Sequence, residues 1–175
     1  MCGSARLVVA ATWDGRPIPA PERVRIDLDW NTERLRIGVD APFHSDPPPP
    51  APAGSTDRLW EHEVVEVFLA SDTDPHRYTE IELGPWGHYL VLRFSGPRRR
   101  VGGHRPLEFE ASRTADRWSG TALLDADELP PRPWRGNAYA IHGQGDARRY
   151  LAVHRTPGPH PDFHQPAFFP RLEAR

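Results

Sequence analysis

The sequence predicts an all-β fold: an antiparallel β-sandwich of the jelly-roll type that spans residues 1–175 as a single domain. Three observations carry this prediction. Short runs with strand-like alternation recur along the chain, clusters of turn residues separate them, and no stretch shows the long 3.6-residue periodicity of an amphipathic helix. A chain of 175 residues can bury a sizeable core, so about ten short strands need no disulfide or metal to hold them together.

The N-terminal part predicts one short strand followed by a hairpin. Residues 6–12 form a mostly apolar run that ends at a turn in residues 13–17. Apolar residues then alternate with polar ones in residues 23–28 and 34–39, on either side of a turn at residues 31–33. This alternation is typical of a hairpin with one face toward the core and the other toward solvent.

The segment of residues 46–56 is rich in proline. Because proline lacks a backbone N–H and restricts the backbone, this segment cannot be a helix or the interior of a strand. We expect an extended, polyproline-like loop. It serves either as an ordinary surface loop or as a stiff rim beside a binding site.

The strongest strand is predicted at residues 62–69, where Val65, Val67 and Leu69 share one face and Glu66 lies on the other. The clearest hairpin follows, with strands at residues 77–83 and 88–95 around a turn at residues 84–87. Tyr78, Glu80 and Glu82 share one face of its first strand. If Leu83 pairs with His88, the opposing residues are Glu82 and Tyr89, Glu80 and Val91, and Tyr78 and Arg93.

The C-terminal half predicts a further antiparallel pair, a short helical turn at residues 125–129 and three late strands. The pair comprises residues 107–112 and 117–124, and the late strands comprise residues 137–142, 150–154 and 168–173. The core candidates of the pair are Phe109, Trp118, Ala122 and Leu124.

The composition excludes several functional classes. The net charge of −2 predicts no affinity for nucleic acid or membranes. All 22 basic residues are arginine, which we interpret as the coding bias of a GC-rich bacterial genome. The single cysteine, Cys2, allows no intramolecular disulfide. With no signal peptide and no apolar run long enough to span a bilayer, the expected location is the cytoplasm.

Acidic residues on one sheet face form the first candidate site. Glu66, Glu80 and Glu82 lie among aromatic residues such as Trp60 and Tyr78. Such a face could simply be exposed to water. Alternatively, carboxylates can accept hydrogen bonds from sugar hydroxyls while aromatic rings stack on the sugar. The same carboxylates could also bind calcium or act as an acid/base pair.

Histidines supply two weaker candidates. In the C-terminal segment, His160, Asp162 and His164 alternate, which suits part of a transition-metal site or an ordinary loop capped by Asp162. His142 ends a predicted strand and enters a glycine-containing loop, where it is either a site residue or packed inside. Within the sequence we find no nucleotide-binding fingerprint, nucleophile elbow or zinc-protease motif.

The segment from Leu59 to Phe68 resembles the signature strand of carbohydrate-binding module 9 and DOMON-like domains, in which an aromatic residue precedes an acidic Val-Glu-x-Phe strand. More closely, the chain resembles a small uncharacterised protein family of animals and bacteria. The matching stretches lie at residues 13–15, 41–43, 46–48, 59–68, 78–83, 87–92, 95–96, 140–143 and 161–164.

This resemblance implies a module-9-like sandwich but no known activity. In the sugar-binding modules, two aromatic rings enclose a sugar beside polar groups. Trp60 would take the place of one ring and Glu66 of one polar contact, and Trp86, Trp118 and Trp134 are candidates for the second ring. The calcium ligands of the modules have no clear counterparts here. Haem-binding DOMON relatives use methionine as an axial ligand, and the only methionine here is Met1, which argues against haem.

We therefore predict a ligand-binding β-sandwich whose candidate ligand is a carbohydrate or a similar polar small molecule. The alternatives are a small enzyme with acid/base or metal-assisted chemistry at the same face, and a domain that binds a partner through a sheet edge or the proline-rich loop. The predicted ligand-binding residues are Trp60, Glu66, Glu80, Glu82, Arg93, His142, Asp162 and His164. The sequence assigns no catalytic residue, metal ligand, cofactor or oligomeric state.

Overall fold

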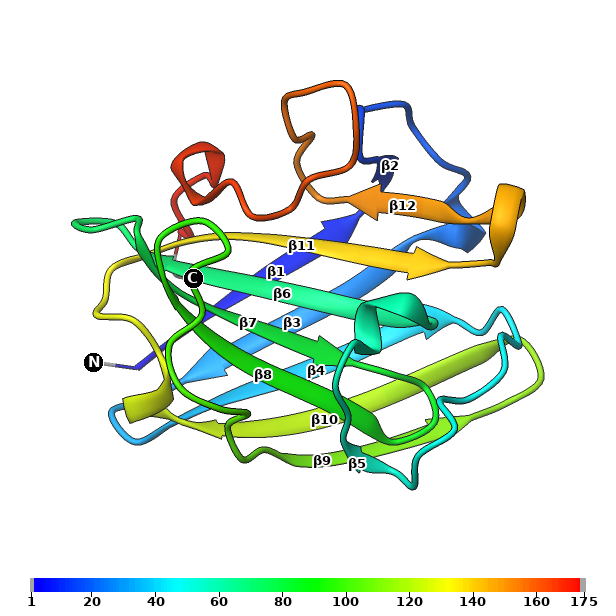
Figure 1. The fold of residues 1–175 in the computed structure, drawn as a ribbon, viewed down its shortest axis with the longest axis horizontal. Helices are drawn as coiled ribbons and strands as arrows, with labels where there is room; N and C mark the ends of the chain where they lie inside the picture. Colours follow the sequence, from blue (N-terminus) through cyan, green and yellow to red (C-terminus); the bar gives the residue numbers. More distant parts are fainter. Residues whose placement is uncertain (1, 174–175) are drawn as a thin grey trace.

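The computed structural model describes residues 2–173, which form two β-sheets packed face to face (Figure 1). The five-stranded sheet contains, in spatial order, β1 (Gly3–Val9), β3 (Val24–Trp30), β4 (Arg34–Pro42), β10 (Arg117–Asp125) and β9 (Glu108–Arg113). The seven-stranded sheet contains, in spatial order, β2 (Ala11–Thr12), β12 (Arg149–Ala152), β11 (Trp134–His142), β6 (Val64–Ser71), β7 (Arg77–Leu83), β8 (His88–Ser95) and β5 (Gly54–Ser55). Neighbouring strands are antiparallel except for the short parallel pair of β5 and β8. The predicted antiparallel β-sandwich is confirmed.

Short 3-10 helices occupy several connections between the strands. Those in residues 2–173 are η1 (Ala20–Glu22), η2 (Leu59–Glu61), η3 (Ala126–Glu128), η4 (Gly145–Ala147) and η5 (Pro166–Phe168). The helix η3 is the helical turn predicted between β10 and β11. In the part of the chain that the structure describes, no helix is long and apolar enough to cross a membrane.

The main core lies between the two sheets and follows the predicted alternation. Val65, Val67 and Leu69 of β6 are buried in it, as are Ile81 and Leu83 of β7. The buried residues that the five-stranded sheet contributes include Ile26, Leu28, Leu35, Ile37, Trp118, Ala122 and Leu124. Each fully buried valine, leucine or isoleucine stabilises the fold by about 1.5–3 kcal/mol, so this core supplies much of the driving force for folding.

A second apolar layer covers the opposite face of the seven-stranded sheet. Phe68 of β6 and Tyr139 of β11 are buried there against Phe163 and Phe169 of the C-terminal segment, residues 153–173. This segment follows β12 and is coloured orange to red in Figure 1. Every residue of β6 is buried as a result. The seven-stranded sheet is therefore covered on both faces, whereas the outer face of the five-stranded sheet meets solvent.

The register predicted for the hairpin of β7 and β8 is wrong by one residue. The N–H of Gly84 donates to the carbonyl of His88 at 2.8 Å, and Gly87 has a φ of 83°. The loop is therefore a three-residue turn that ends on a left-handed glycine, not the four-residue turn that was expected. Leu83 consequently faces Tyr89. On the opposite, outer face, Glu82 pairs with Leu90, Glu80 with Leu92 and Tyr78 with Phe94.

Other differences concern short segments. Residues 168–173 do not form a closing strand, because Pro166 and Pro170 interrupt the segment and Arg171 makes only one isolated bridge. The start of the signature segment, Leu59–Glu61, is the 3-10 helix η2. Gly54 and Ser55, at the end of the proline-rich loop, form the edge strand β5.

Candidate functional site

Three buried glutamates meet on the outer face of the seven-stranded sheet. Glu66 of β6 and Glu82 of β7 are direct cross-strand partners, and Glu80 lies two residues before Glu82 on the same face. Carboxylate oxygens of the three residues lie within 4.8 Å of one another. Only 2% of Glu66, 4% of Glu80 and 0% of Glu82 is exposed. The structure thus brings together three predicted site residues, but the reading of their face as exposed to water is wrong.

Burial controls the electrostatics of this glutamate cluster, which we define as Glu66, Glu80 and Glu82. Loss of solvation raises the pKa of all three carboxyl groups, that of Glu80 to about 8. The charge of Glu80 raises the pKa of Glu66 further, and Glu66 and Glu80 do the same to Glu82. Neither oxygen of Glu82 makes a well-formed hydrogen bond with a described residue, although the backbone N–H of Trp60 tends to lower its pKa.

The C-terminal segment places one predicted residue, His164, beside this cluster and a second, Asp162, next to His164. The Nε2 atom of His164 lies 3.9 Å from Oε1 of Glu80, and its Nδ1 atom is 2.9 Å from the hydroxyl of Tyr78. Burial, followed by the charge of Arg98, lowers the pKa of His164 to about 4, so the imidazole is neutral at pH 7. Asp162 accepts hydrogen bonds from the backbone N–H of His164 and from the Arg98 side chain.

His142 lies elsewhere, at one end of the interior between the sheets. Its ring stacks on that of His44, with 3.5 Å between the centroids. Burial, followed by the charge of His44, lowers the pKa of His142 to about 3. Nearby, Glu63 accepts backbone hydrogen bonds from His44 and Asp46, but its burial still raises its pKa to about 7. His142 therefore does not lie with His164, Asp162 and the glutamates, although all of them were predicted to bind the same ligand.

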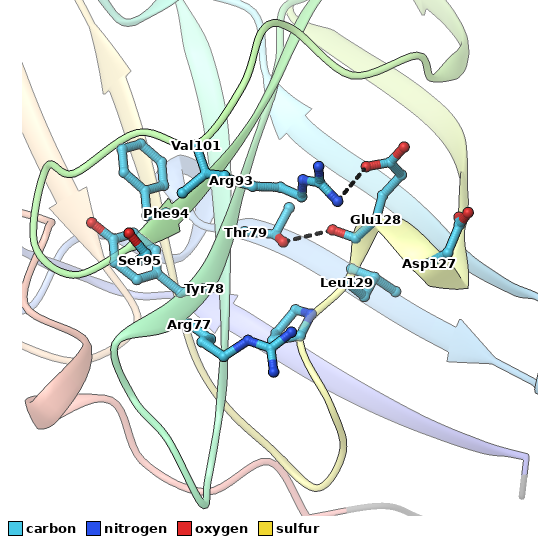
Figure 2. Close-up of a pocket in the computed structure, with 11 residues that line it drawn as sticks. Arg77, Tyr78, Thr79, Arg93, Phe94, Ser95, Val101, Asp127, Glu128 and Leu129 are labelled. Carbon is cyan, nitrogen blue, oxygen red and sulfur yellow. Dashed lines mark hydrogen bonds and ion pairs between the residues drawn. The ribbon is translucent and has the colours of Figure 1, made fainter.

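Arg93 is also separate from the glutamate cluster, because it points from the other face of β8. It pairs with Thr79, whose hydroxyl donates to the carbonyl of Glu128, and its guanidinium lies 3.5 Å from the Glu128 carboxylate. Figure 2 shows these residues lining a pocket of about 260 Å³ next to η3. The one-residue error in register explains the wrong prediction, since it had placed Arg93 opposite Tyr78.

An open groove of about 410 Å³ lies beside Trp60. Trp60 is 38% exposed, which is unusual for so large an apolar residue in this fold. The other residues that line the groove are Pro47, Glu61, His62, Ile141, Gln144, Gly145, Arg148 and Tyr150. Arg148 donates to the carbonyls of Trp60 and Gly143, and its guanidinium carbon lies 5.8 Å from the centre of the Tyr150 ring. Through these hydrogen bonds, Arg148 links η2 to the loop that follows β11.

Sequence reasoning missed the second aromatic ring of this groove. Tyr150 pairs with Ile141 across β11 and β12, so the two side chains share the outer face. The sequence feature that could have identified Tyr150 is its position in the strand that follows the glycine loop of residues 143–145. The three tryptophans considered for this role lie elsewhere. Trp118 and Trp134 are buried in the core, and the ring of Trp86 lies 3.9 Å from the Arg113 guanidinium carbon.

Similar animal proteins cover most of this chain. The human UPF0462 protein C4orf33 is 39% identical over 166 residues, which span 90% of this chain and 82% of the human protein. The rat homolog is also 39% identical, with 90% and 82% covered, and the zebrafish homolog is 36% identical, with 90% and 83% covered. No protein-family model matches the chain. Because the relatives found come from mammals and fish, the predicted bacterial source is wrong.

Similar solved structures share the fold at low sequence identity. A putative carbohydrate-binding protein from Bacteroides uniformis has a TM-score of 0.74 at 18% identity, covering 95% of this chain and 84% of that one. A family 9 carbohydrate-binding module from Caldicellulosiruptor kristjanssonii, in complex with cellotriose, has a TM-score of 0.55 at 12% identity, with 100% and 83% covered. The same kind of module in complex with glucose has a TM-score of 0.56 at 14% identity, with 100% and 85% covered. The predicted module-9-like sandwich is confirmed.

Proposed function

The chain belongs to the UPF0462 protein family, and we propose that it binds a carbohydrate or a similar polyol in the groove beside Trp60. The observation that carries this proposal is the pairing of two aromatic side chains, Trp60 and Tyr150, with polar groups at one open groove. Aromatic rings stack on the apolar faces of sugars, and guanidinium and amide groups bond to sugar hydroxyls. Arg148 and Gln144 supply such groups here.

Support from outside the groove comes from the fold. The structural neighbours include modules in complex with glucose and cellotriose. A fold hosts many functions, so the argument rests on the groove itself. Glu66, Glu80 and Glu82 are almost fully buried, so the proposed direct contacts come from the groove residues and not from these carboxylates.

Calorimetric titration of the purified chain with glucose, cellotriose and a panel of other saccharides tests the proposal. We expect saturable binding to at least one sugar, and a loss of about fivefold or more in affinity for Trp60→Ala, since stacking on one ring is worth about 1 kcal/mol or more. Tyr150→Ala should weaken binding in the same direction. Phe168→Ala is the matched control, because Phe168 is a 62% exposed aromatic residue outside the groove.

Two results would overturn the proposal. One is the absence of saturable heat with every sugar at millimolar concentration. The other is a Trp60→Ala variant that binds the sugar as tightly as the unmodified chain while Phe168→Ala does the same. Near-ultraviolet circular dichroism of each variant shows whether its tertiary structure is retained.

A further inference from the structure

The glutamate cluster lacks a strong cationic partner from the protein. Among residues 2–173, the basic side chain that contacts it is His164, whose neutral imidazole lies 3.9 Å from Glu80. Arg98 and Arg148 lie close enough to influence Glu80 and Glu66 but are bonded to other groups. Arg98 donates to Asp162 at 2.8 Å, and Arg148 donates to backbone carbonyls. Carboxyl groups placed this close together in a buried site must either bind protons or be balanced by a cation.

Glu82 supplies a second and independent observation. It is fully buried, and neither of its oxygens has a hydrogen-bond partner of good geometry in the described chain. Its carboxyl group points toward Glu66 and Glu80, with ligand atoms within 4.8 Å of theirs. Buried polar groups in folded proteins are nearly always paired, and an unpaired one costs about 1–3 kcal/mol. An unpaired carboxyl aimed into a cluster of acceptors therefore favours a cation-binding site.

We propose that Glu66, Glu80, Glu82 and His164 bind one divalent transition-metal ion, of the class of Mn²⁺ or Zn²⁺. The ligand atoms of a single ion lie about 2.0–2.5 Å from it, and hence within about 5 Å of one another. The three glutamates meet this condition together, and His164 meets it with respect to Glu80. They lie on two adjacent strands of the sheet, which fix their spacing.

His164 determines the class of metal. Its Nδ1 atom bonds to the Tyr78 hydroxyl, which orients the ring and leaves Nε2 on the side of Glu80. Tyr78 is held in turn by the backbone N–H of Arg98, which donates to its hydroxyl at 3.0 Å. A purely carboxylate site suits calcium or magnesium, whereas an added imidazole nitrogen favours a transition metal over these two ions.

Metal titration of the chelator-treated chain tests the site. We expect one equivalent of Mn²⁺ or Zn²⁺ to bind by calorimetry. The Glu82→Gln variant, which keeps the size of the side chain, should bind about 100-fold more weakly, because removing even a second-shell group costs 10–100-fold. Glu66→Gln is a second variant for the case in which Glu82→Gln does not fold. Glu63→Gln is the matched control, since Glu63 is another buried glutamate outside the cluster.

Electron paramagnetic resonance identifies the nitrogen ligand. The Mn²⁺-loaded chain should show coupling to one histidine nitrogen, and His164→Leu should lose it. If no ion binds at one equivalent, or if Glu82→Gln and Glu66→Gln bind as tightly as Glu63→Gln, the site does not exist. If Mn²⁺ binds without nitrogen coupling, or Ca²⁺ binds more tightly than Mn²⁺, the assignment of His164 and of the metal class is wrong.

Discussion

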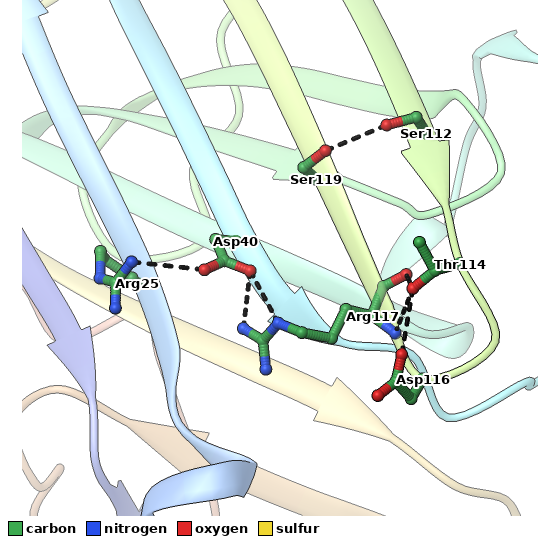
Figure 3. Close-up of polar contacts among 7 residues, drawn as sticks. All are labelled: Arg25, Asp40, Ser112, Thr114, Asp116, Arg117 and Ser119. Atoms are coloured by element: carbon green, nitrogen blue, oxygen red, sulfur yellow. Dashed lines mark hydrogen bonds and ion pairs between the residues drawn. The ribbon is translucent and has the colours of Figure 1, made fainter.

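The charged residues on the outer faces of the two sheets differ in whether they have partners of opposite charge. On the exposed face of the five-stranded sheet, acidic and basic residues alternate across strands and pair with one another. Figure 3 shows Asp40 of β4 between Arg25 of β3 and Arg117 of β10. The carboxylate of Asp40 lies 3.4 Å from the Arg25 guanidinium and 2.6 Å from the Arg117 guanidinium. The outer face of the seven-stranded sheet carries the glutamate cluster instead, with a neutral histidine as its neighbour.

The difference arises from what covers each sheet. Both sheets are built from strands with the same two-residue alternation. Nothing in the described chain shields the outer face of β3 and β4, so their charged side chains remain solvated and form exposed ion pairs of low energy. The C-terminal segment and η2 cover the other sheet and remove water from around its carboxyl groups. Buried carboxyl groups with such raised pKa values are typical of functional sites.

The largest expected effect on stability comes from truncating Phe68, which packs against the C-terminal segment that covers the seven-stranded sheet. Phe68 is fully buried and meets the rings of Tyr139, His164 and Phe169 at centroid distances of 5.4–5.9 Å. Phe68→Ala should lower the free energy of unfolding by about 3–5 kcal/mol, through lost burial and a cavity. Urea denaturation followed by fluorescence measures this change.

Val8→Ala provides the comparison on the other sheet. Val8 is 37% exposed on the outer face of β1, so its truncation should change stability by less than about 0.5 kcal/mol. If Phe68→Ala were as mild as Val8→Ala, the C-terminal segment would not cover the sheet in solution, and the contrast between the two faces would fail.

Replacing the unpaired carboxyl with an apolar side chain of similar size should stabilise the protein. In the presence of a chelator, Glu82→Met removes a buried group without a good hydrogen bond, and we expect a gain of about 1–3 kcal/mol. The midpoint of urea denaturation at constant slope measures it. A loss of stability in this variant would show that Glu82 has a favourable partner within the protein.

Acid should destabilise the protein in part through His142. Burial lowers the pKa of this imidazole from 6.5 to about 3, and His44, Arg149 and Arg148 act in the same direction. Because the folded state binds fewer protons than the unfolded state in that range, the stabilisation is present above pH 6.5 and is lost as the pH falls toward 3.

The variant His142→Gln measures this contribution. Its stability should fall less steeply between pH 6.5 and 4 than that of the unmodified chain, by up to about 1.4 kcal/mol per pH unit. Because its pKa is raised to about 7, Glu63 increases the stability of the folded state as the pH falls over part of this range. The contribution of His142 is therefore the difference between the stability curves of the variant and the unmodified chain. Equal slopes would show that His142 is solvated.

The sequence predicts strands and faces better than it predicts what covers them. Period-two alternation correctly separated Val65 and Val67 from Glu66, because side-chain direction along a strand is a local property. Whether Glu66 meets water depends on residues about 100 positions later, in the C-terminal segment, and no local pattern encodes that contact. The placement of Arg93 failed for a smaller reason, a turn shorter by one residue.

The resemblance to a known family supplied what local patterns could not. It identified the sandwich and singled out Trp60, which lines an open groove. It did not find Tyr150, because the partner ring of the sugar-binding modules was sought among tryptophans. Histidines were the least predictable residues, since His142 and His164 occupy different layers of the fold.

Among the changes that remove a charged or titratable group, the smallest expected effect lies on the exposed face, in the network of Figure 3. Asp40 is 41% exposed and pairs with both Arg25 and Arg117. Asp40→Asn keeps the shape of the side chain and removes its charge, so we expect a loss of less than about 1 kcal/mol in the free energy of unfolding. The loss should shrink further in 1 M salt, where screening acts over about 3 Å. A loss of several kcal/mol that persists in high salt would mean that this network is as shielded from water as the glutamate cluster, and coverage would no longer explain why the two faces differ.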